Sequence, residues 1–375
     1  MSNVRIFFAG DFCSKPTTSY IIVSEQLQDL IKSCDVSIVN FEVPLKPEGV
    51  TFPPSRQERF YQHDDVPQFL RNIGFKLFSI ANNHLLDWGE KGYEKTMRAL
   101  GNDCFGAGTY DEAYGVKKVE VNGVKVGFLA LSYAARWGVF DDVSNHEGVG
   151  CAYINDLKVN HVIMEAKKEL DYLFVLPHDG IEYVDIPMPE TIARYRDFID
   201  YGADGVIGSH PHCPQGWEEY KGKPIFYSLG NLFFNSKEDT LYRAWNRPHW
   251  YEGMCVIMEI GDGAINYSII NTRNTDNVSL SIDDDGNRNA HNKMLVEYLK
   301  DKGKYEACLN EVVASSASTY IIDQTCHPKT LLRCTKRLLK YWLAKLKGKD
   351  FTDDFELSAL LRNDTRRSVL IKDIK

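Results

Sequence analysis

Five apolar segments of this sequence end at side chains that can bind a metal ion. The segments run over 4–10, 36–39, 76–81, 172–177 and 205–209, and the groups that end them are Asp11, Asn40-Phe41-Glu42, Asn82-Asn83-His84, His178 and His210-Pro211-His212. Each segment has the composition of a buried β-strand, and the carboxyl ends of parallel strands in an α/β sheet line one crevice. Carboxylate, amide and imidazole groups that converge there suit a divalent transition metal.

The most specific local motif is Gly208-Ser209-His210-Pro211-His212. In an extended segment, residues two apart place their side chains on the same side, and the intervening proline stiffens the backbone. The two imidazoles are therefore candidates to bind one metal ion or to divide between two neighbouring ions. The alternative is a pair of histidines that serve only the packing of the core or surface.

His178 also follows a fully apolar segment, which places it at a strand end as a candidate ligand. Four residues later, Glu182 has three open roles: a metal ligand, a carboxylate that orients a histidine, or a general base. In the same way, Cys13 two residues after Asp11 is either a soft metal ligand or a small buried apolar residue.

A second group of polar residues precedes the helix expected from residue 89. Asn83 offers a neutral oxygen to a cation, and His84 beside it is free to act on a leaving group. Asp87 either orients His84 or caps the helix. At the neighbouring strand end, Glu42 can bridge two metal ions, and two ions roughly 3.5–4 Å apart suit an in-line displacement at phosphorus.

Composition narrows the class of protein. The chain has 375 residues and a formal charge of −8, which argues against a nucleic-acid partner. Its nine cysteines are scattered and form no Cys-x-x-Cys pair, so a reducing compartment, the cytoplasm, is expected. We find no secretory signal and no apolar stretch long enough for a membrane span. Nothing in the sequence indicates an oligomeric state.

The order of strand and helix signals predicts an α/β domain over residues 1–285 and a helical extension over 286–375. Helices are expected over 24–32, 89–100, 155–170 and 189–201. Hairpins are expected around Asn122-Gly123 and around Gly261-Asp262-Gly263, with strands of the second half completing a second sheet. Residues 44–66 and 235–250 are expected to be long loops that shape access to the site.

Residues 328–349 combine eight basic residues with a Leu/Trp stripe at helical spacing. Such a helix is suited to peripheral contact with an anionic membrane surface. The alternative, which we favour, is that the stripe packs on the main domain and the lysines stay in water.

Several stretches resemble the capsule-synthesis family CapA, also called the poly-γ-glutamate biosynthesis family, of the calcineurin-like metallophosphatase superfamily. The resemblance covers about residues 4–260, and the stretches that carry it are Gly10-Asp11, 40–42, 79–89, 178–183, 202–212 and 223–234. It implies a four-layer α/β/β/α sandwich with two metal ions, manganese, zinc or iron, at strand ends. Residues 286–375 lie outside it and form a helical appendage.

The resemblance also implies individual roles. Asp11 and His212 would bind the first metal ion, Glu42 would bridge, and Asn83, His178 and His210 would bind the second. His84 would be the acid near the leaving group. The sequence departs from the superfamily pattern in two places, because Cys13 stands where phosphatases have histidine and Glu42 stands where they have aspartate.

Two functions are therefore open. The first is a metal-dependent hydrolase of a phosphoester or related bond in cell-envelope or polymer metabolism, in which His84, Asp87 and Glu182 serve catalysis. The second is a non-catalytic component of a capsule or poly-γ-glutamate synthesis complex that binds polymer or partner proteins. The missing histidine at position 13 motivates the second reading.

Overall fold

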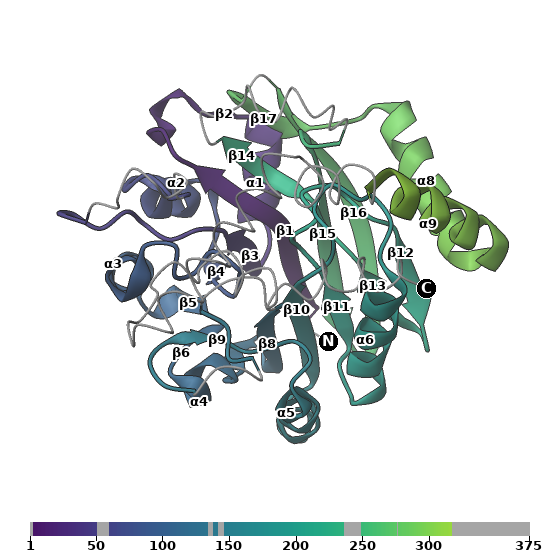
Figure 1. Ribbon diagram of the computed structural model, residues 1–375, viewed down its shortest axis with the longest axis horizontal. Coiled ribbons are helices and arrows are strands. Elements are labelled where there is room, and N and C mark those ends of the chain that lie inside the picture. Colours follow the sequence, from purple (N-terminus) through teal and green to yellow (C-terminus); the bar gives the residue numbers. More distant parts are fainter. Residues whose placement is uncertain are drawn as a thin grey trace, which may run out of the picture. The chain divides into compact units, whose positions relative to one another are not determined.

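A computed structural model describes residues 3–50, 60–133, 138–141, 146–235, 249–275 and 277–316 (Figure 1). The chain divides into two compact units, Met1–Leu299 and Lys300–Lys375. All of the strands described below, and the candidate site, belong to the first unit.

The larger sheet of the first unit has nine strands among the described residues. Its order is β2 (Ile22–Val23), β17 (Ser279–Ile282), β16 (Ala264–Thr275), β15 (Glu252–Gly261), β1 (Val4–Ser14), β3 (Val36–Phe41), β4 (Leu77–Ser79) and β5 (Cys104–Phe105), with β14 (Asn231–Asn235) also paired to β1. Strand β1 pairs in parallel with β3 and β14 and antiparallel with β15. Three strands thus converge on β1, and Figure 1 shows it in the middle of the sheet.

A second sheet has six strands among the described residues. Its order is β12 (Trp217–Tyr220), β13 (Lys223–Phe226), β11 (Gly205–Ile207), β10 (Tyr172–His178), β8 (Val124–Ser132) and β7 (Lys117–Val121). Strand β10 pairs in parallel with β8 and β11. A short ladder joins β6 (Ala107–Gly108) to β9 (Gly150–Cys151).

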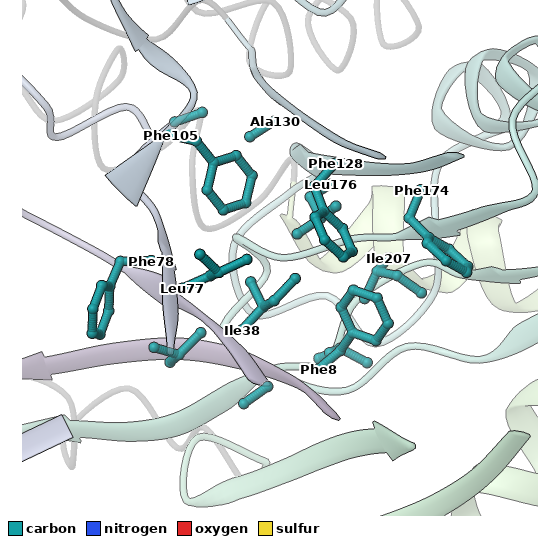
Figure 2. Close-up of a cluster of buried hydrophobic side chains, with 14 of the residues drawn as sticks. Phe8, Ile38, Leu77, Phe78, Phe105, Phe128, Ala130, Phe174, Leu176 and Ile207 are labelled. Carbon is teal, nitrogen blue, oxygen red and sulfur yellow. The ribbon is translucent and has the colours of Figure 1, made fainter. Parts of the chain in front are cut away.

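The two sheets pack face to face through aromatic side chains. Phe8 of β1 lies with its ring centroid 6.1 Å from that of Phe128 in β8 and 5.5 Å from that of Phe174 in β10 (Figure 2). The preceding Phe7 points to the opposite face, where its ring centroid lies 6.1 Å from that of Phe75. Because both faces of β1 are covered, its sequence is apolar almost without interruption.

Helices cover the outer faces of both sheets. The nine-stranded sheet is covered by α1 (Glu25–Lys32), α2 (Val66–Ile73) and α3 (Gly89–Leu100), and the six-stranded sheet by α5 (Leu157–Lys167) and α6 (Pro189–Asp200). Short helical turns are η1 (Thr18–Tyr20), η2 (Gly101–Asp103) and α4 (Tyr110–Ala113). The result is the predicted α/β/β/α order of layers.

The helices expected from the sequence are confirmed as α1, α3, α5 and α6. Local signals set their ends: Ser24 caps α1 by accepting a hydrogen bond from the Leu27 amide at 3.4 Å, and Pro189 begins α6. Both hairpins are also confirmed, with Asn122 and Gly123 at φ values of 53° and 79°.

Strands β11, β12 and β13 confirm that strands of the second half complete a second sheet, but the second hairpin does not belong to it. Strands β15 and β16 extend the first sheet beside β1 instead of completing the second. Hydrophobic alternation shows that a strand has a buried face, but it does not show which of two stacked sheets receives it.

Beyond residue 285 the described chain is helical, as α8 (Gly286–Lys300) and α9 (Lys302–Ser316). Helix α8 belongs to the first unit up to Leu299 and packs on β16 there, because Asn292 Nδ2 donates to Asn271 Oδ1 at 2.8 Å. The domain boundary at residue 285 stays a prediction. Residues 328–349, with their expected basic helix, lie outside the described residues. None of the described helices has the length and apolarity needed to span a membrane.

Truncation of the ring at the sheet interface tests this packing. Phe8→Ala is expected to lower the free energy of unfolding by about 3–5 kcal/mol, because Phe8 is 1% exposed and its loss leaves a cavity between the sheets. Urea unfolding followed by circular dichroism measures the change. Leu157→Ala is the control, since Leu157 is 81% exposed, and its effect is expected to be near zero. Equal effects of the two substitutions would contradict this packing.

Candidate metal centre

The carboxylate of Asp11 stands where β1 leaves its regular ladder. The pairing of β1 with β3 shifts register between Ala9 and Asp11, and the Asp11 amide donates to the Gly230 carbonyl at 2.9 Å. A Cβ atom at Gly10 would lie 1.9 Å from that carbonyl oxygen, so only glycine fits there. This close approach of two backbone segments turns the fully buried Asp11 toward the second sheet.

The neighbouring strand β3 supplies Asn40 and Glu42. Asn40 Nδ2 donates to Asp11 Oδ1 at 2.6 Å and lies 3.1 Å from His178 Nδ1. Glu42 is fully buried, and neither of its carboxylate oxygens has a hydrogen-bond partner among the described residues. A buried carboxylate without donors is stabilised by a cation or by a proton, so Glu42 fits a metal ligand.

The loop between β4 and α3 supplies Asn83, His84 and Asp87, all at least 94% buried. Its backbone is fixed by Asn82, whose side chain accepts a hydrogen bond from the His84 amide at 3.1 Å. His84 Nδ1 lies 2.9 Å from Asp87 Oδ2, and His84 Nε2 lies 3.9 Å from Glu42 Oε1. Asp87 was expected either to orient His84 or to cap α3. The N-cap position of α3 is occupied by Trp88, which makes no capping bond, so Asp87 contacts His84 instead.

The second sheet supplies the remaining imidazoles, from β10 and from the segment after β11. His210 and His212 have φ values of 102° and 57°, in a region that costs a residue with a side chain roughly 1–3 kcal/mol. A contact between the sheets stabilises this backbone conformation, because the His210 amide donates to Asp11 Oδ2 at 3.1 Å. Backbone strain of this kind clusters at functional sites.

The first group of candidate ligands is Asp11, Glu42 and His212, whose ligand atoms all lie within 4.8 Å of one another. His212 Nδ1 is 3.5 Å from Asp11 Oδ2, and His212 Nε2 is 3.6 Å from Glu42 Oε1. The family resemblance assigns Asp11 and His212 to the first metal ion and gives Glu42 as the bridge. Two carboxylates and an imidazole form a suitable donor set for a divalent cation.

The second group is Asn83, His178 and His210. His178 Nε2 lies 2.9 Å from Asn83 Oδ1 and 3.1 Å from His210 Nδ1. The three donor atoms therefore point toward one another, as the resemblance implies for the second metal ion. His178 and His210 are both 1% exposed, so this group lies below the protein surface.

Glu182 and Cys13 differ in their relation to these groups. The Glu182 carboxylate lies within 4.8 Å of ligand atoms of His210 and His212 and is partly exposed, which places it at the rim. Cys13 packs with Val43, Phe234 and Trp250. Burial raises the pKa of the Cys13 thiol well above its ordinary value, which favours the reading of Cys13 as a small buried apolar residue.

Electrostatics at the cluster favour a bound cation. Burial raises the pKa of the Asp11 carboxyl; it also raises that of Glu42, where the negative charges of Asp11 and Glu182 add to the effect. Burial lowers the pKa of both His178 and His212, so these imidazoles are neutral, the form that binds a metal. A divalent cation would reverse the penalty on the two carboxylates.

Three polar residues orient the candidate ligands, and sequence analysis had left two of them, Ser209 and Asn231, without a role. Asn231 Oδ1 lies 2.9 Å from His212 Nδ1, which leaves Nε2 facing Glu42. Ser209 Oγ and Asn40 Nδ2 lie 3.0 and 3.1 Å from His178 Nδ1, which leaves Nε2 facing Asn83. Partners of this kind fix the tautomer and direction of a metal-binding histidine. Each of the three is a polar residue inside or beside an apolar segment, and this position is the feature of the sequence that could have identified it.

The loop expected over residues 44–66 contributes Gln62, which is fully buried. Its Nε2 donates to the Phe12 and Glu42 carbonyls at 2.6 and 2.8 Å, and its Oε1 accepts from the Ser14 amide at 2.8 Å. One side chain thus fastens the end of β1 to the end of β3. The loop therefore supports the ligand-bearing backbone.

Comparison with known proteins gives the family. The profile of "Bacterial capsule synthesis protein PGA_cap" matches residues 5–236. The capsule biosynthesis protein CapA of Bacillus anthracis is 29% identical over 228 residues, 58% of this chain and 54% of that protein. The PGA biosynthesis protein CapA of Bacillus subtilis is 30% identical over 220 residues, 57% of each. The matched region thus spans about half the length of these curated relatives.

Among solved structures, a putative 5'-nucleotidase from Staphylococcus aureus in complex with alpha-ketoglutarate aligns with a TM-score of 0.46 and 16% identity, over 80% of this chain and 59% of that chain. A similarity at this level assigns neither activity nor ligand. The profile match covers more than half of the 375 residues and includes every candidate ligand described above. This chain is therefore a member of the bacterial capsule synthesis protein family PGA_cap.

Proposed function

We propose that this chain is a metal-dependent hydrolase that acts on a phosphoester or related bond in cell-envelope or polymer metabolism. The observation that carries the proposal is the convergence of two buried ligand groups beside the His84–Asp87 pair. Strand ends from two different sheets build this cluster, and a cation would stabilise its carboxylates. A protein that needed only a stable core would be better served by apolar residues at these positions.

In this proposal, Asp11, Glu42 and His212 hold one divalent ion, and Asn83, His178 and His210 hold a second. Manganese, zinc and iron all accept such nitrogen and oxygen donors. Two bound ions would supply Lewis-acid activation of water and would stabilise charge on the phosphoryl oxygens. Glu182 at the rim extends the donor set of His210 and His212 toward solvent.

The contribution of the protein itself centres on His84. Asp87 holds His84 Nδ1 at 2.9 Å, so Nε2 is the atom left to hold a proton. This Nε2 faces the cluster, 3.9 Å from Glu42 Oε1. In that position it can give the proton to the leaving oxygen, and Asp87 fixes the ring and stabilises its charged form.

The substrate in this proposal is a phosphoester or a polymer that carries a related bond. Nucleic acid is unsuited, because the formal charge of −8 repels a polyanion. We further propose a cytoplasmic location, since every cysteine among the described residues is free.

A second function has one observation in its favour. Cys13 stands in an apolar cluster with Val43, Phe234 and Trp250. The first metal group therefore has three described side chains, none of them from position 13. A non-catalytic component of a capsule synthesis complex would tolerate this loss and would use the fold to bind polymer or partner proteins.

Removal of the acid distinguishes the two functions. With the metal-loaded protein, His84→Ala is expected to lower kcat on phenyl phosphate by about 10²–10⁴, the usual contribution of general acid catalysis. The loss on 4-nitrophenyl phosphate is expected to be much smaller, because nitrophenolate leaves without a proton. Steady-state rates of both substrates measure the difference, and Asp87→Asn is expected to show the same preference more weakly.

Two results would count against the hydrolase. One is a metal-loaded wild type that cleaves neither ester, which favours the binding component. The other is a His84→Ala variant whose loss is the same for both esters. Metal content of each variant is measured in parallel, so that a lost ion is not mistaken for a lost acid.

Metal binding itself is tested with conservative substitutions. His178→Gln and His210→Gln are each expected to weaken binding of manganese or zinc at least about 10-fold, since a metal ligand matters no less than the groups that orient it. Metal per protein after dialysis, measured by inductively coupled plasma mass spectrometry, gives the result. His161→Gln is the control, because His161 is exposed on α5. Unchanged metal content in folded variants would remove both residues from the site.

The buried carboxylates give a stability prediction for the chelator-treated protein. Glu42→Gln is expected to raise its free energy of unfolding by about 1–3 kcal/mol, because the substitution removes a buried charge beside Asp11. Added manganese is expected to stabilise the wild type more than the variant. Urea unfolding with and without the ion measures both, and exposed Glu48 provides the control substitution Glu48→Gln. A variant less stable than the wild type without metal would contradict the prediction.

A further inference from the structure

A second cluster of possible metal ligands lies outside the candidate centre. It consists of Asp185, between β10 and α6, His249, just before β15, and His291 in α8. One ligand atom from each lies within 4.8 Å of the other two, and all three residues are partly exposed. The cluster shares no residue with the groups around Asp11 and His178. It therefore does not depend on the function proposed above.

His249 of this cluster is oriented as a metal ligand usually is. His249 Nδ1 lies 2.6 Å from Glu252 Oε2, which leaves Nε2 as the free ring nitrogen. A carboxylate on one ring nitrogen fixes the tautomer and raises the basicity of the other. Arg288 and Arg273 pair with Glu252 in turn, so its charge is balanced inside this network.

His291 offers the clearest sign that a ligand is expected. Its Nε2 is buried and has no hydrogen-bond partner among the described residues, although the Asp185 Oδ2 atom lies 3.4 Å away. Its ring also stacks on that of His249, with centroids 4.4 Å apart. Burial and the nearby positive charge of Arg288 lower the pKa of His249, which keeps its imidazole neutral. Two imidazoles beside one carboxylate form a donor set that suits a metal cation.

The donor set selects the class of cation. Calcium and magnesium take oxygen ligands, whereas two imidazoles and a carboxylate suit zinc and similar transition metals. Zinc bonds of about 2.0–2.1 Å would draw the three ligand atoms to roughly 3.4 Å from one another. Small side-chain rotations from their present spacing of at most 4.8 Å are enough. A water molecule would complete the tetrahedron.

We propose that Asp185, His249 and His291 form a second metal site, for a zinc-class ion, that ties α8 to the wall of the candidate metal centre. Tyr183, two residues before Asp185, stacks on His212 with ring centroids 5.8 Å apart. Trp250, directly after His249, lies with its ring centroid 5.1 Å from that of His212. An ion at the second site thus fixes the two aromatic side chains that flank a ligand of the first.

The experiment uses the full-length protein and zinc alone. The double variant His178→Gln/His210→Gln weakens the first centre, so the second site can be measured separately. In this background, His291→Gln is expected to weaken zinc binding at least 10-fold in a competition with a chromogenic chelator, while His161→Gln has no effect. Native mass spectrometry is expected to show one zinc fewer after His291→Gln. Equal zinc affinity and stoichiometry with and without His291 would overturn the proposal.

A measurement on the wild type covers the case in which these variants do not fold. Zinc is expected to slow the modification of His249 and His291 by diethyl pyrocarbonate at least 10-fold, as mapped by peptide mass spectrometry, and to leave exposed His161 unaffected. No protection, or equal protection of His161, would overturn the proposal. Zinc affinity and protection from diethyl pyrocarbonate do not depend on phosphoester hydrolysis. A protein without hydrolase activity would therefore refute the proposed function and leave the test of the second metal site unaffected.

Discussion

The burial of Asp11 and Glu42 side by side is the constraint on which the rest of the site depends. Both residues are fully buried, and Glu42 has no hydrogen-bond partner among the described residues. Such a pair costs stability unless a cation lies between the carboxylates. The surrounding structure serves to keep them there, since Gln62 ties together the strands that bear them, and Asn40 donates to Asp11.

The same constraint explains why the site lies between two sheets. Ligands from one sheet would form a row along its edge, whereas a cation needs donors from several directions. The His210 amide reaches Asp11 from the opposite sheet, and the positive φ values of His210 and His212 aim their rings back at β1. The aromatic core around Phe8 keeps the two sheets together, and this packing offsets the local backbone strain.

Sequence analysis found most of the candidate ligands, because each follows an apolar strand, and strand ends are easily recognised. It placed all five strand ends at one crevice of one sheet, whereas β10 and β11 belong to a second sheet. Residues that act by orienting others were missed, since nothing in the local pattern separates Asn231 or Ser209 from ordinary loop polar groups. Asp185, His249 and His291 were missed for a different reason: they come from two connections and a helix, so no single period or motif links them.

The side chain at position 13, where the resemblance implies a histidine, also bears on the neighbouring His212. Cys13 is fully buried with Phe234 and Trp250, and these aromatic side chains also contact His212, with ring centroids 5.0 and 5.1 Å away. Apolar contacts thus hold His212 on the side where a further ligand would stand. The group around Asp11 offers two carboxylates and one imidazole, whereas the group around His178 offers one amide oxygen and two imidazoles. In the proposed site, the two carboxylates of the first group would attract a divalent cation more strongly than the neutral donors of the second.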